Sequence, residues 1–269
     1  MERLKLLYWR ARMWALNRAY AVLRPDRVRM PGGRTMHLHP SDARGAALWA
    51  NAGNVNRGSM ALWQLLLRLH PWSVVLDVGA NHGEMLLFPD LPAGARVVAF
   101  EPNPDLAPLL RRSLADSGVP VEVVQSAVGS IDGRLTLYMD LQWSGTTSAI
   151  AANTSGTHRA VEVPLTRLDT FLAGLQPTDT LLVKLDVEGQ EWDVLQGLMP
   201  VLHRLGRVAM MVEVHRLAPD AFGAVTAAFD VLAMDSDGRL QRQPALRQAE
   251  LGDLDVVLVP KGDTAHYGA

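Results

Sequence analysis

The stretch Val-Val-Leu-Asp-Val-Gly-Ala-Asn-His-Gly, residues 74–83, decides the fold class. A short apolar run with the character of a buried strand leads directly into a turn bounded by two glycines, Gly79 and Gly83. In parallel α/β sheets, ligands bind beyond the carboxyl ends of the strands, where glycines let the backbone approach closely. Glycine pairs also occur in plain strand-to-helix turns, so this stretch needs support from the rest of the chain.

Short apolar runs of similar character recur along the chain and alternate with helix-like segments. The expected strands are Val74–Val78, Val97–Phe100, Val121–Ala127, Leu181–Leu185, Val208–Val214, 230–234 and 254–259. The expected helices are Ser59–His70, Pro104–Ser117 and Glu191–Leu205. This alternation predicts an α/β fold of the Rossmann-like, doubly wound kind, with a mostly parallel sheet and helices on both faces. We expect this domain to span residues 71–262.

Residues 1–70 precede the regular pattern and form a predicted extension. Residues 1–24 read as a basic amphipathic helix, because apolar side chains recur at helical spacing and residues 1–29 hold eight basic residues against two acids. Residues 27–40 read as a hairpin around a Pro-Gly-Gly turn. The helix could pack on its own domain or on a second subunit of a homo-oligomer, or it could make a peripheral contact with an anionic membrane. We favour packing.

Composition excludes several classes of protein. The chain has 269 residues, 48% of them hydrophobic and 20% charged, which is ordinary for a globular protein. It has no cysteine, so disulfides, thiolate nucleophiles and Cys-ligated metals are excluded, and a cytoplasmic location poses no difficulty. No apolar run reaches the roughly 18 residues of a membrane-spanning helix. The formal net charge of -2 gives no reason to expect a nucleic-acid partner.

An acid at the end of the second expected strand indicates a nucleoside cofactor. Glu101 follows the glycine turn by about 20 residues, the spacing at which a carboxylate accepts both hydroxyls of a ribose. A dinucleotide would favour Gly-x-Gly-x-x-Gly and a phosphate cradle, which this turn lacks. Asp77, two residues before Gly79, suits the cationic headgroup of an amino acid better than a pyrophosphate. S-adenosylmethionine, which has a ribose, an ammonium and no phosphate, fits best.

Three blocks resemble the FkbM family of S-adenosylmethionine-dependent methyltransferases, over about Val74–Arg216. They are Leu-Asp-Val-Gly-Ala-Asn-His-Gly (76–83), Ala-Phe-Glu-Pro-Asn-Pro (99–104) and Leu-Val-Lys-Leu-Asp-Val-Glu-Gly-Gln-Glu-Trp-Asp-Val-Leu-Gln-Gly (182–197). The third block is the most specific. The resemblance implies a class I methyltransferase fold, a seven-stranded sheet with one antiparallel strand, and methyl transfer to an oxygen.

The same resemblance implies a set of cofactor-binding residues. The residues expected to border the methionine moiety are Asp77, Gly79, Asn81 and Gly83. Glu101 would hold the ribose, and the residues expected beside the adenine are Ser126, Ala127 and Val128. One departure from the family is that Pro89 and Pro92 predict an unusually short helix after the glycine turn.

Two further strand ends carry the expected catalytic groups. Alternation places Lys184, Asp186 and Glu188 on one side of their strand, and Glu213 and His215 on one side of the next. His215 or Asp186 could take the proton from an acceptor hydroxyl, because an imidazole titrates near working pH. The acids and the histidine could instead bind a divalent metal, which stays an open alternative.

A polar stretch before the third block is the expected acceptor site. In residues 141–149 Trp143 could stack on a sugar ring, while the hydroxyls expected to bond it are Ser144, Thr146, Thr147 and Ser148. We expect Glu188 and Glu213 to face the same acceptor. The preferred function is therefore methyl transfer to a hydroxyl of a sugar, glycoconjugate or small natural product. The alternatives are an inactive S-adenosylmethionine-binding scaffold and, less favoured, a nicotinamide-dependent oxidoreductase.

Overall fold

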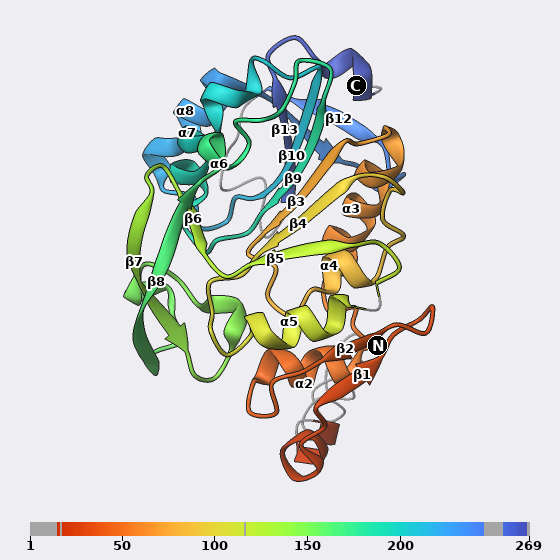
Figure 1. The fold of residues 1–269 in the computed structure, drawn as a ribbon, viewed down its shortest axis with the longest axis vertical. Coiled ribbons are helices and arrows are strands. Elements are labelled where there is room, and N and C mark those ends of the chain that lie inside the picture. Colours follow the sequence, from red (N-terminus) through yellow and green to blue (C-terminus); the bar gives the residue numbers. More distant parts are fainter. Residues whose placement is uncertain (1–14, 17, 116, 245–254, 268–269) are drawn as a thin grey trace, which may run out of the picture.

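A large twisted sheet forms the centre of the protein in the computed structural model, which describes residues 15–16, 18–115, 117–244 and 255–267. The strands of this sheet follow the order β12-β11-β13-β10-β9-β3-β4-β5 (Figure 1). They are β3 (Val74–Val78), β4 (Arg96–Phe100), β5 (Val121–Val124), β9 (Thr180–Leu185), β10 (Arg207–Glu213), β11 (Phe229–Met234), β12 (Leu240–Gln243) and β13 (Asp255–Pro260).

The strand directions confirm the predicted class I architecture. Strands β5, β4, β3, β9 and β10 pair in parallel, and β13 is inserted antiparallel between β10 and β11. The seven expected strands are therefore present with one of them antiparallel. An eighth, β12, extends the edge antiparallel to β11 and was not predicted.

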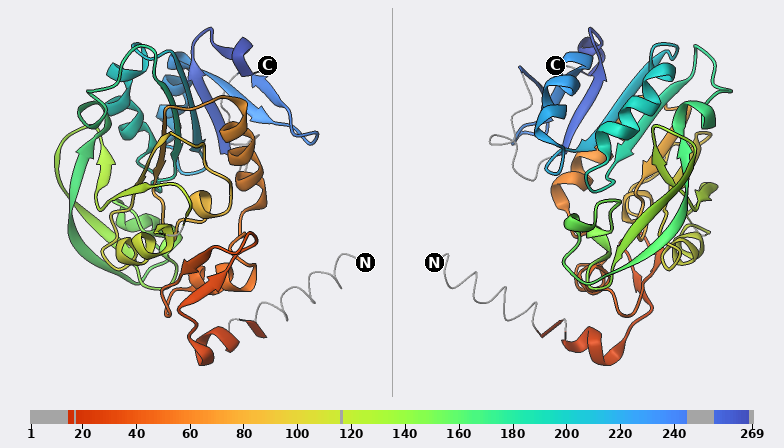
Figure 2. Two further views of the ribbon diagram at one scale, coloured as in Figure 1. Left: turned by 45° about the vertical axis from the view of Figure 1, so that its right-hand side comes forward. Right: turned by 90° about the vertical axis from the view of Figure 1, so that its left-hand side faces the viewer.

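Helices cover both faces of the sheet, as Figure 2 shows. The described helices are α2 (Ala43–Ala50), α3 (Arg57–Leu69), α4 (Glu84–Leu87), α5 (Ala107–Leu114), α6 (Leu168–Phe171), α7 (Glu191–Leu202) and α8 (Pro219–Ala228). Alternate residues of each strand enter two separate apolar clusters: Val75 packs on the side of α3, and Leu76 on the side of α7. The continuous apolar strands follow from this, because neither face is left to solvent.

The short helix after the glycine turn confirms one prediction, and β5 corrects another. Helix α4 spans only Glu84–Leu87, as the following prolines indicated. The expected strand Val121–Ala127 is wrong as a single element: β5 ends at Val124, and β6 (Ala127–Gly129) joins a second sheet. In that sheet β6 pairs with β8 (His158–Arg167), and β8 pairs with β7 (Gly133–Asp140).

The N-terminal extension shares the core of the main domain. Its hairpin, β1 (Arg27–Arg29) and β2 (Thr35–His37), is present as predicted. Helix α3 begins after Asn56, whose side chain accepts a hydrogen bond from the Ser59 amide, and ends at the extended His70 before a proline. Fully buried Trp63 of α3 donates its indole N–H to Met85 O at 2.8 Å. The packing is therefore continuous across position 70.

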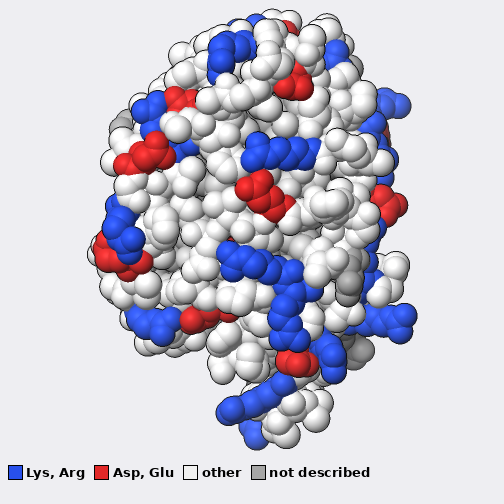
Figure 3. Space-filling view, viewed as in Figure 1, with Lys and Arg blue, Asp and Glu red and all other residues white. Residues whose placement is uncertain are grey.

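The expected N-terminal helix lies mostly outside the described residues. Of it, residues 18–23 are helical and Tyr20 is buried in the shared core. On the face shown in Figure 3, basic side chains gather over the lower part, where the hairpin and α5 lie. The exposed arginines of that region include Arg27, Arg29, Arg111 and Arg112. Among the described residues, no helix combines the length and apolar character needed to cross a bilayer.

Candidate active site

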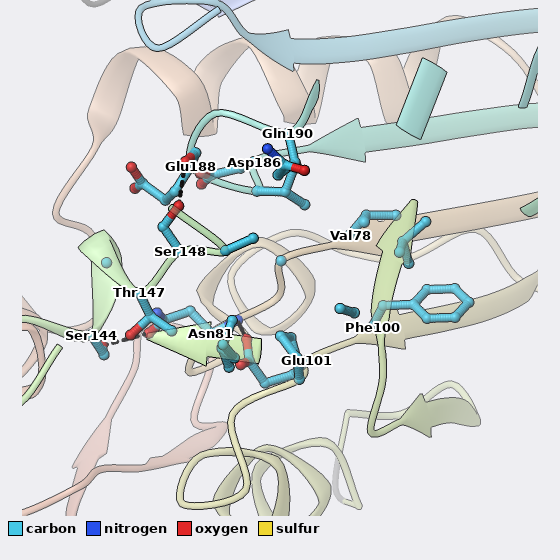
Figure 4. Close-up of a pocket in the computed structure, with 18 of the residues that line it drawn as sticks. Val78, Asn81, Phe100, Glu101, Ser144, Thr147, Ser148, Asp186, Glu188 and Gln190 are labelled. Atoms are coloured by element: carbon cyan, nitrogen blue, oxygen red, sulfur yellow. Dashed lines mark hydrogen bonds between the residues drawn. The ribbon is translucent and has the colours of Figure 1, made fainter. Parts of the chain in front are cut away.

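A cavity opens at the carboxyl ends of β3, β4 and β9, where the strand order reverses on either side of β3. It holds about 700 Å³ of empty space, including its mouth. This is the switch point at which open α/β sheets bind ligands. Figure 4 shows side chains from the glycine turn, from β4, from β9 and from the loop after β7 turned toward one another around it.

The glycine turn is built for close approach. Gly79 has a φ of 81°, and a Cβ placed on it would lie 1.8 Å from the carbonyl oxygen of Asp186. No side chain fits there, so the turn after β3 and the end of β9 meet directly. The amides of Gly79 and Ala80 both donate to Phe100 O at 3.0 Å. These contacts fix the turn against β4 and present Asn81, with a φ of 51°, to the cavity.

Glu101 directly follows β4 and has its carboxylate in the cavity wall. Its Oε2 accepts a hydrogen bond from the backbone N–H of Asn81 at 2.7 Å, and its Oε1 accepts one from the backbone N–H of Asn103 at 2.8 Å. Burial raises the pKa of Glu101 to about 7, although the two backbone hydrogen bonds act to lower it. The carboxylate thus has a fixed orientation and keeps lone pairs free for a ligand hydroxyl.

A buried lysine of β9 contacts the neighbouring strand β3 and the turn that follows it. Lys184 Nζ lies 3.0 Å from Gly79 O, 3.3 Å from Asp77 Oδ1 and 3.2 Å from Asp186 Oδ2. Burial disfavours its charged form, but Asp186 and Asp77 outweigh this and hold the pKa of Lys184 above its usual value. The ammonium therefore stays charged and anchors the glycine turn to β9.

Acidic side chains crowd the ends of β9 and β10. The carboxyl groups of Asp186 and Glu213 influence each other's ionisation. Burial and the Asp186 charge raise the pKa of Glu213 well above its usual range, whereas Lys184 and Arg44 hold the pKa of Asp186 below its usual value against the effect of burial. Glu213 is therefore the protonated member of the pair and Asp186 the anionic one.

Glu188 and His215 complete this acidic cluster. Burial, followed by the nearby Asp186 charge, raises the pKa of Glu188 to about 8. Its backbone has a φ of 57°, held by hydrogen bonds from Ser148 Oγ and Asn153 Nδ2 to Glu188 O at 2.8 and 2.7 Å. His215 Nδ1 lies 3.4 Å from Glu213 Oε1.

The cluster could offer a metal ion three ligand atoms. One atom each of Glu188, Glu213 and His215 lies within 4.8 Å of the others. Arg216 already places positive charge there, with Nε 2.5 Å from Glu188 Oε2 and 3.2 Å from His215 Nε2. Because this guanidinium serves two of the three candidate ligands, we derive no step through a metal.

The loop after β7 closes one side of the cavity and is organised by Asp140. The Asp140 carboxylate accepts hydrogen bonds from five donors: Gln142 N, Trp143 N, Thr146 Oγ1, Ser155 N and Ser155 Oγ. Burial would raise the pKa of Asp140, but these hydrogen bonds hold it well below its usual value. Ser144 Oγ donates to Asp42 Oδ2 at 2.6 Å, which ties the loop to the N-terminal extension.

The sequence of residues 77–239 matches the methyltransferase FkbM domain, more than half of the 269 residues. The chain belongs to the FkbM methyltransferase family. No curated protein matches it.

Several solved methyltransferase structures are similar to this FkbM chain at low identity. A methyltransferase from Geobacter sulfurreducens is 17% identical, with a TM-score of 0.43 over 81% of this chain and 86% of its own. Precorrin-6y C5,15-methyltransferase from Geobacter metallireducens is 13% identical, with a TM-score of 0.40 over 77% and 90%. An RNA methyltransferase from Salinibacter ruber, in complex with S-adenosyl-L-homocysteine, is 16% identical, with a TM-score of 0.33 over 77% and 94%.

Most of the residues that the sequence predicted for the site of this FkbM methyltransferase line the cavity. They are Gly79, Asn81, Glu101, Ser126, Ala127, Val128, Ser144, Asp186 and Glu188. Thr147 and Ser148 of the predicted acceptor loop line it too. Family membership makes S-adenosylmethionine the methyl donor.

Other predicted residues lie elsewhere. Asp77 is fully buried beneath the turn and paired with Lys184, and it lines neither of the two cavities described here. Gly83 faces Leu110 of α5, where a Cβ would lie 2.5 Å from Cδ1. The Trp143 indole packs against Gly145 and Thr146 bonds Asp140, so neither lines the cavity.

Glu213 and His215 stand behind Asp186 rather than in the cavity wall. Glu213 lines a second, adjoining cavity of about 480 Å³ between the start of α3 and the ends of β9 and β10. The two cavities share the walls Arg44, Gly79, Asn81 and Asp186.

Sequence reasoning missed three charged residues of the site. Arg44 lines both cavities from α2, Asp140 holds the acceptor loop, and Arg216 pairs with Glu188. A local signal near Arg44 is Asp42, which caps the N-terminus of α2 and accepts a hydrogen bond from the backbone N–H of Arg44. None of the three belongs to a motif, so their roles come from tertiary packing.

Proposed function

We propose that this methyltransferase transfers a methyl group to a hydroxyl oxygen of a sugar, glycoconjugate or small natural product. The observation that carries the proposal is the position of Asp186: it lines both cavities, and it shares the wall of the second one with Glu213, which lies beside His215. An anionic carboxylate at this point can accept the proton of a hydroxyl.

The cavity walls suit the donor. S-adenosylmethionine supplies an electrophilic methyl group when bound. Glu101 would accept the ribose hydroxyls, and Val128, Leu135 and Leu137 would pack against the adenine. The methionine arm would then pass Gly79, which lines both cavities, and enter the second cavity.

The proton then has a route away from the reacting oxygen. As the oxygen bonds to the methyl carbon, the carbon–sulfur bond breaks and the sulfur keeps its electron pair. The hydroxyl proton passes to Asp186. Glu213, protonated beside Asp186, can release its own proton toward His215, whose Nδ1 lies 3.4 Å from Glu213 Oε1. The negative charge thereby moves from Asp186 to Glu213, where it faces the newly cationic imidazole.

The acceptor would lie under the loop after β7. Ser144, Thr147 and Ser148 line the cavity from this loop, and hydroxyls of this kind recognise the hydroxyls of a sugar. The Trp143 ring packs on Gly145 instead, so it would not stack on the acceptor.

Two experiments test the proposed function. Calorimetry with S-adenosylhomocysteine and NAD should show binding of the first ligand only, whereas binding of NAD alone would favour the oxidoreductase. Incubation with labelled S-adenosylmethionine and a panel of hydroxyl, amine and carbon acceptors should then label hydroxyl compounds only. Binding with no labelled product would favour the inactive scaffold, and labelled amines or carbon acceptors would contradict oxygen transfer.

A further inference from the structure

The walls of the two adjoining cavities are strongly acidic. Their described acids are Glu84, Glu101, Asp186, Glu188, Glu213 and Asp255. Among the described wall residues, the cations are Arg44 and Lys184. The sulfonium and ammonium of S-adenosylmethionine match such walls, but its α-carboxylate would be repelled unless it meets one of these two cations.

Lys184 is already engaged by groups of the chain itself. Its ammonium donates to Gly79 O at 3.0 Å and is paired with Asp77 and Asp186 at 3.3 and 3.2 Å. Its side chain is also nearly buried, with 8% of its surface exposed. A ligand group would have to displace one of these acceptors, two of which carry charge.

Arg44 is differently placed. It lies between the two cavities on α2, and one arm of its guanidinium pairs with Glu84. Its Nε is buried and has no hydrogen-bond partner among the described residues. A buried donor of a charged group is costly when unpaired, so a ligand oxygen that reached this N–H would remove that cost.

The loop after β7 packs closely against the other arm of the same guanidinium. A Cβ placed on Gly145 would lie 2.8 Å from Arg44 Nη1, so any side chain at this position would press on the arginine. Burial disfavours the charged form of Arg44, but Glu84 and Asp186 hold its pKa above the usual value. The guanidinium is therefore a permanent cation of which Glu84 occupies only one arm.

We propose that Arg44 binds the α-carboxylate of S-adenosylmethionine where the methionine arm crosses from the first cavity to the second. This inference rests on the cofactor placement of the proposed function. It makes helix α2, which precedes the FkbM domain of residues 77–239, a part of the cofactor site. The ammonium of the same amino acid would then face the acids of the second cavity, among them Glu84 and Asp255.

A pair of ligands separates this role from a structural one. S-adenosylhomocysteine has the carboxylate, whereas its decarboxylated analogue S-adenosyl-3-thiopropylamine keeps the ammonium and lacks the carboxylate. Arg44→Ala should weaken S-adenosylhomocysteine binding by about 10- to 100-fold, the range of a hydrogen bond to a charged group. It should change binding of the analogue by less than about 3-fold. The matched control is Arg68→Ala, an exposed arginine on the last turn of α3, which should change neither.

Loss of Arg44 also leaves Glu84 buried without its partner, so the variant could fail to fold. The double variant Arg44→Ala/Glu84→Gln removes that charge, and the ratio of its affinities for the two ligands is the deciding readout. If the ratio of the two affinities is the same in a folded variant as in wild type, the role of Arg44 is overturned while the cofactor site stays in place. Wild-type protein that binds neither ligand would overturn the proposed function itself.

Discussion

Replacing Glu101 by alanine should weaken cofactor binding and destabilise the fold together. Its two oxygens accept hydrogen bonds from the Asn81 and Asn103 amides, so the carboxylate links the glycine turn after β3 to the segment after β4. It also lines the cavity in which the ribose is proposed to lie. One side chain therefore serves the backbone and the ligand.

The two losses have different magnitudes. Ribose hydroxyls that lose a charged acceptor should cost about 1 to 3 kcal/mol, or roughly 5- to 160-fold in Kd. Two backbone N–H groups that lose a charged acceptor would cost about 1 to 3 kcal/mol each if left dry. Since the cavity lets water reach them, we expect the free energy of unfolding of Glu101→Ala to fall by about 2 to 4 kcal/mol.

Two assays separate these effects. Calorimetric titration of S-adenosylhomocysteine, at a temperature where the variant is fully folded, gives the loss of binding, and urea unfolding gives the loss of stability. Glu122→Ala is the matched control, because Glu122 is about half exposed on β5 and pairs with Arg96 across the surface. An unchanged Kd in folded Glu101→Ala would refute the ribose assignment, and unchanged unfolding would refute the structural role.

Other perturbations test the remaining assignments. Asp186→Asn and His215→Ala should each lower turnover, measured as formation of S-adenosylhomocysteine, by about 100- to 10,000-fold with cofactor affinity nearly unchanged, and normal turnover in both would place proton transfer elsewhere. Because burial raises the pKa of Glu188 to about 8, its ionisation should lower the free energy of unfolding as the pH rises from about 5 to 8. The variant Glu188→Gln should show a smaller fall over this range. Identical urea-unfolding profiles of wild type and variant from pH 5 to 9 would contradict this assignment. Deleting residues 1–14 should spare S-adenosylhomocysteine binding, because the cavity walls begin at Arg44. Since Tyr20 packs in the core, intact protein should not float with anionic vesicles, and salt-sensitive flotation would contradict packing.

The main sheet could be predicted because its strands are buried on both faces. A strand such as β3 is apolar at nearly every position, which separates it from loops without knowledge of its neighbours. The second sheet was missed because β7 and β8 are half-buried: Leu135, Leu137 and Met139 alternate with polar residues, and Pro164 interrupts the pattern in β8. Such strands become recognisable only when both members of the pair are considered.

The site was predictable where it lies at strand ends and obscure where it depends on packing between distant segments. Gly79, Glu101 and Asp186 follow or end apolar runs, so the parallel sheet brings them together. The contact from Ser144 to Asp42 joins residues 102 positions apart, and no local pattern predicts it. Arg44 enters the site through the same packing of α2 on the loop after β7.

The five hydrogen bonds gathered by Asp140 bear on how quickly and how selectively the protein recognises an acceptor. They join the turn at 142–146 to Ser155 through a charge that belongs to the chain itself. The conformational entropy of the loop is therefore lost during folding, and an incoming molecule meets a surface that is already shaped. Such preorganisation favours ligands that match the existing arrangement of hydroxyls over ligands that would have to remodel it.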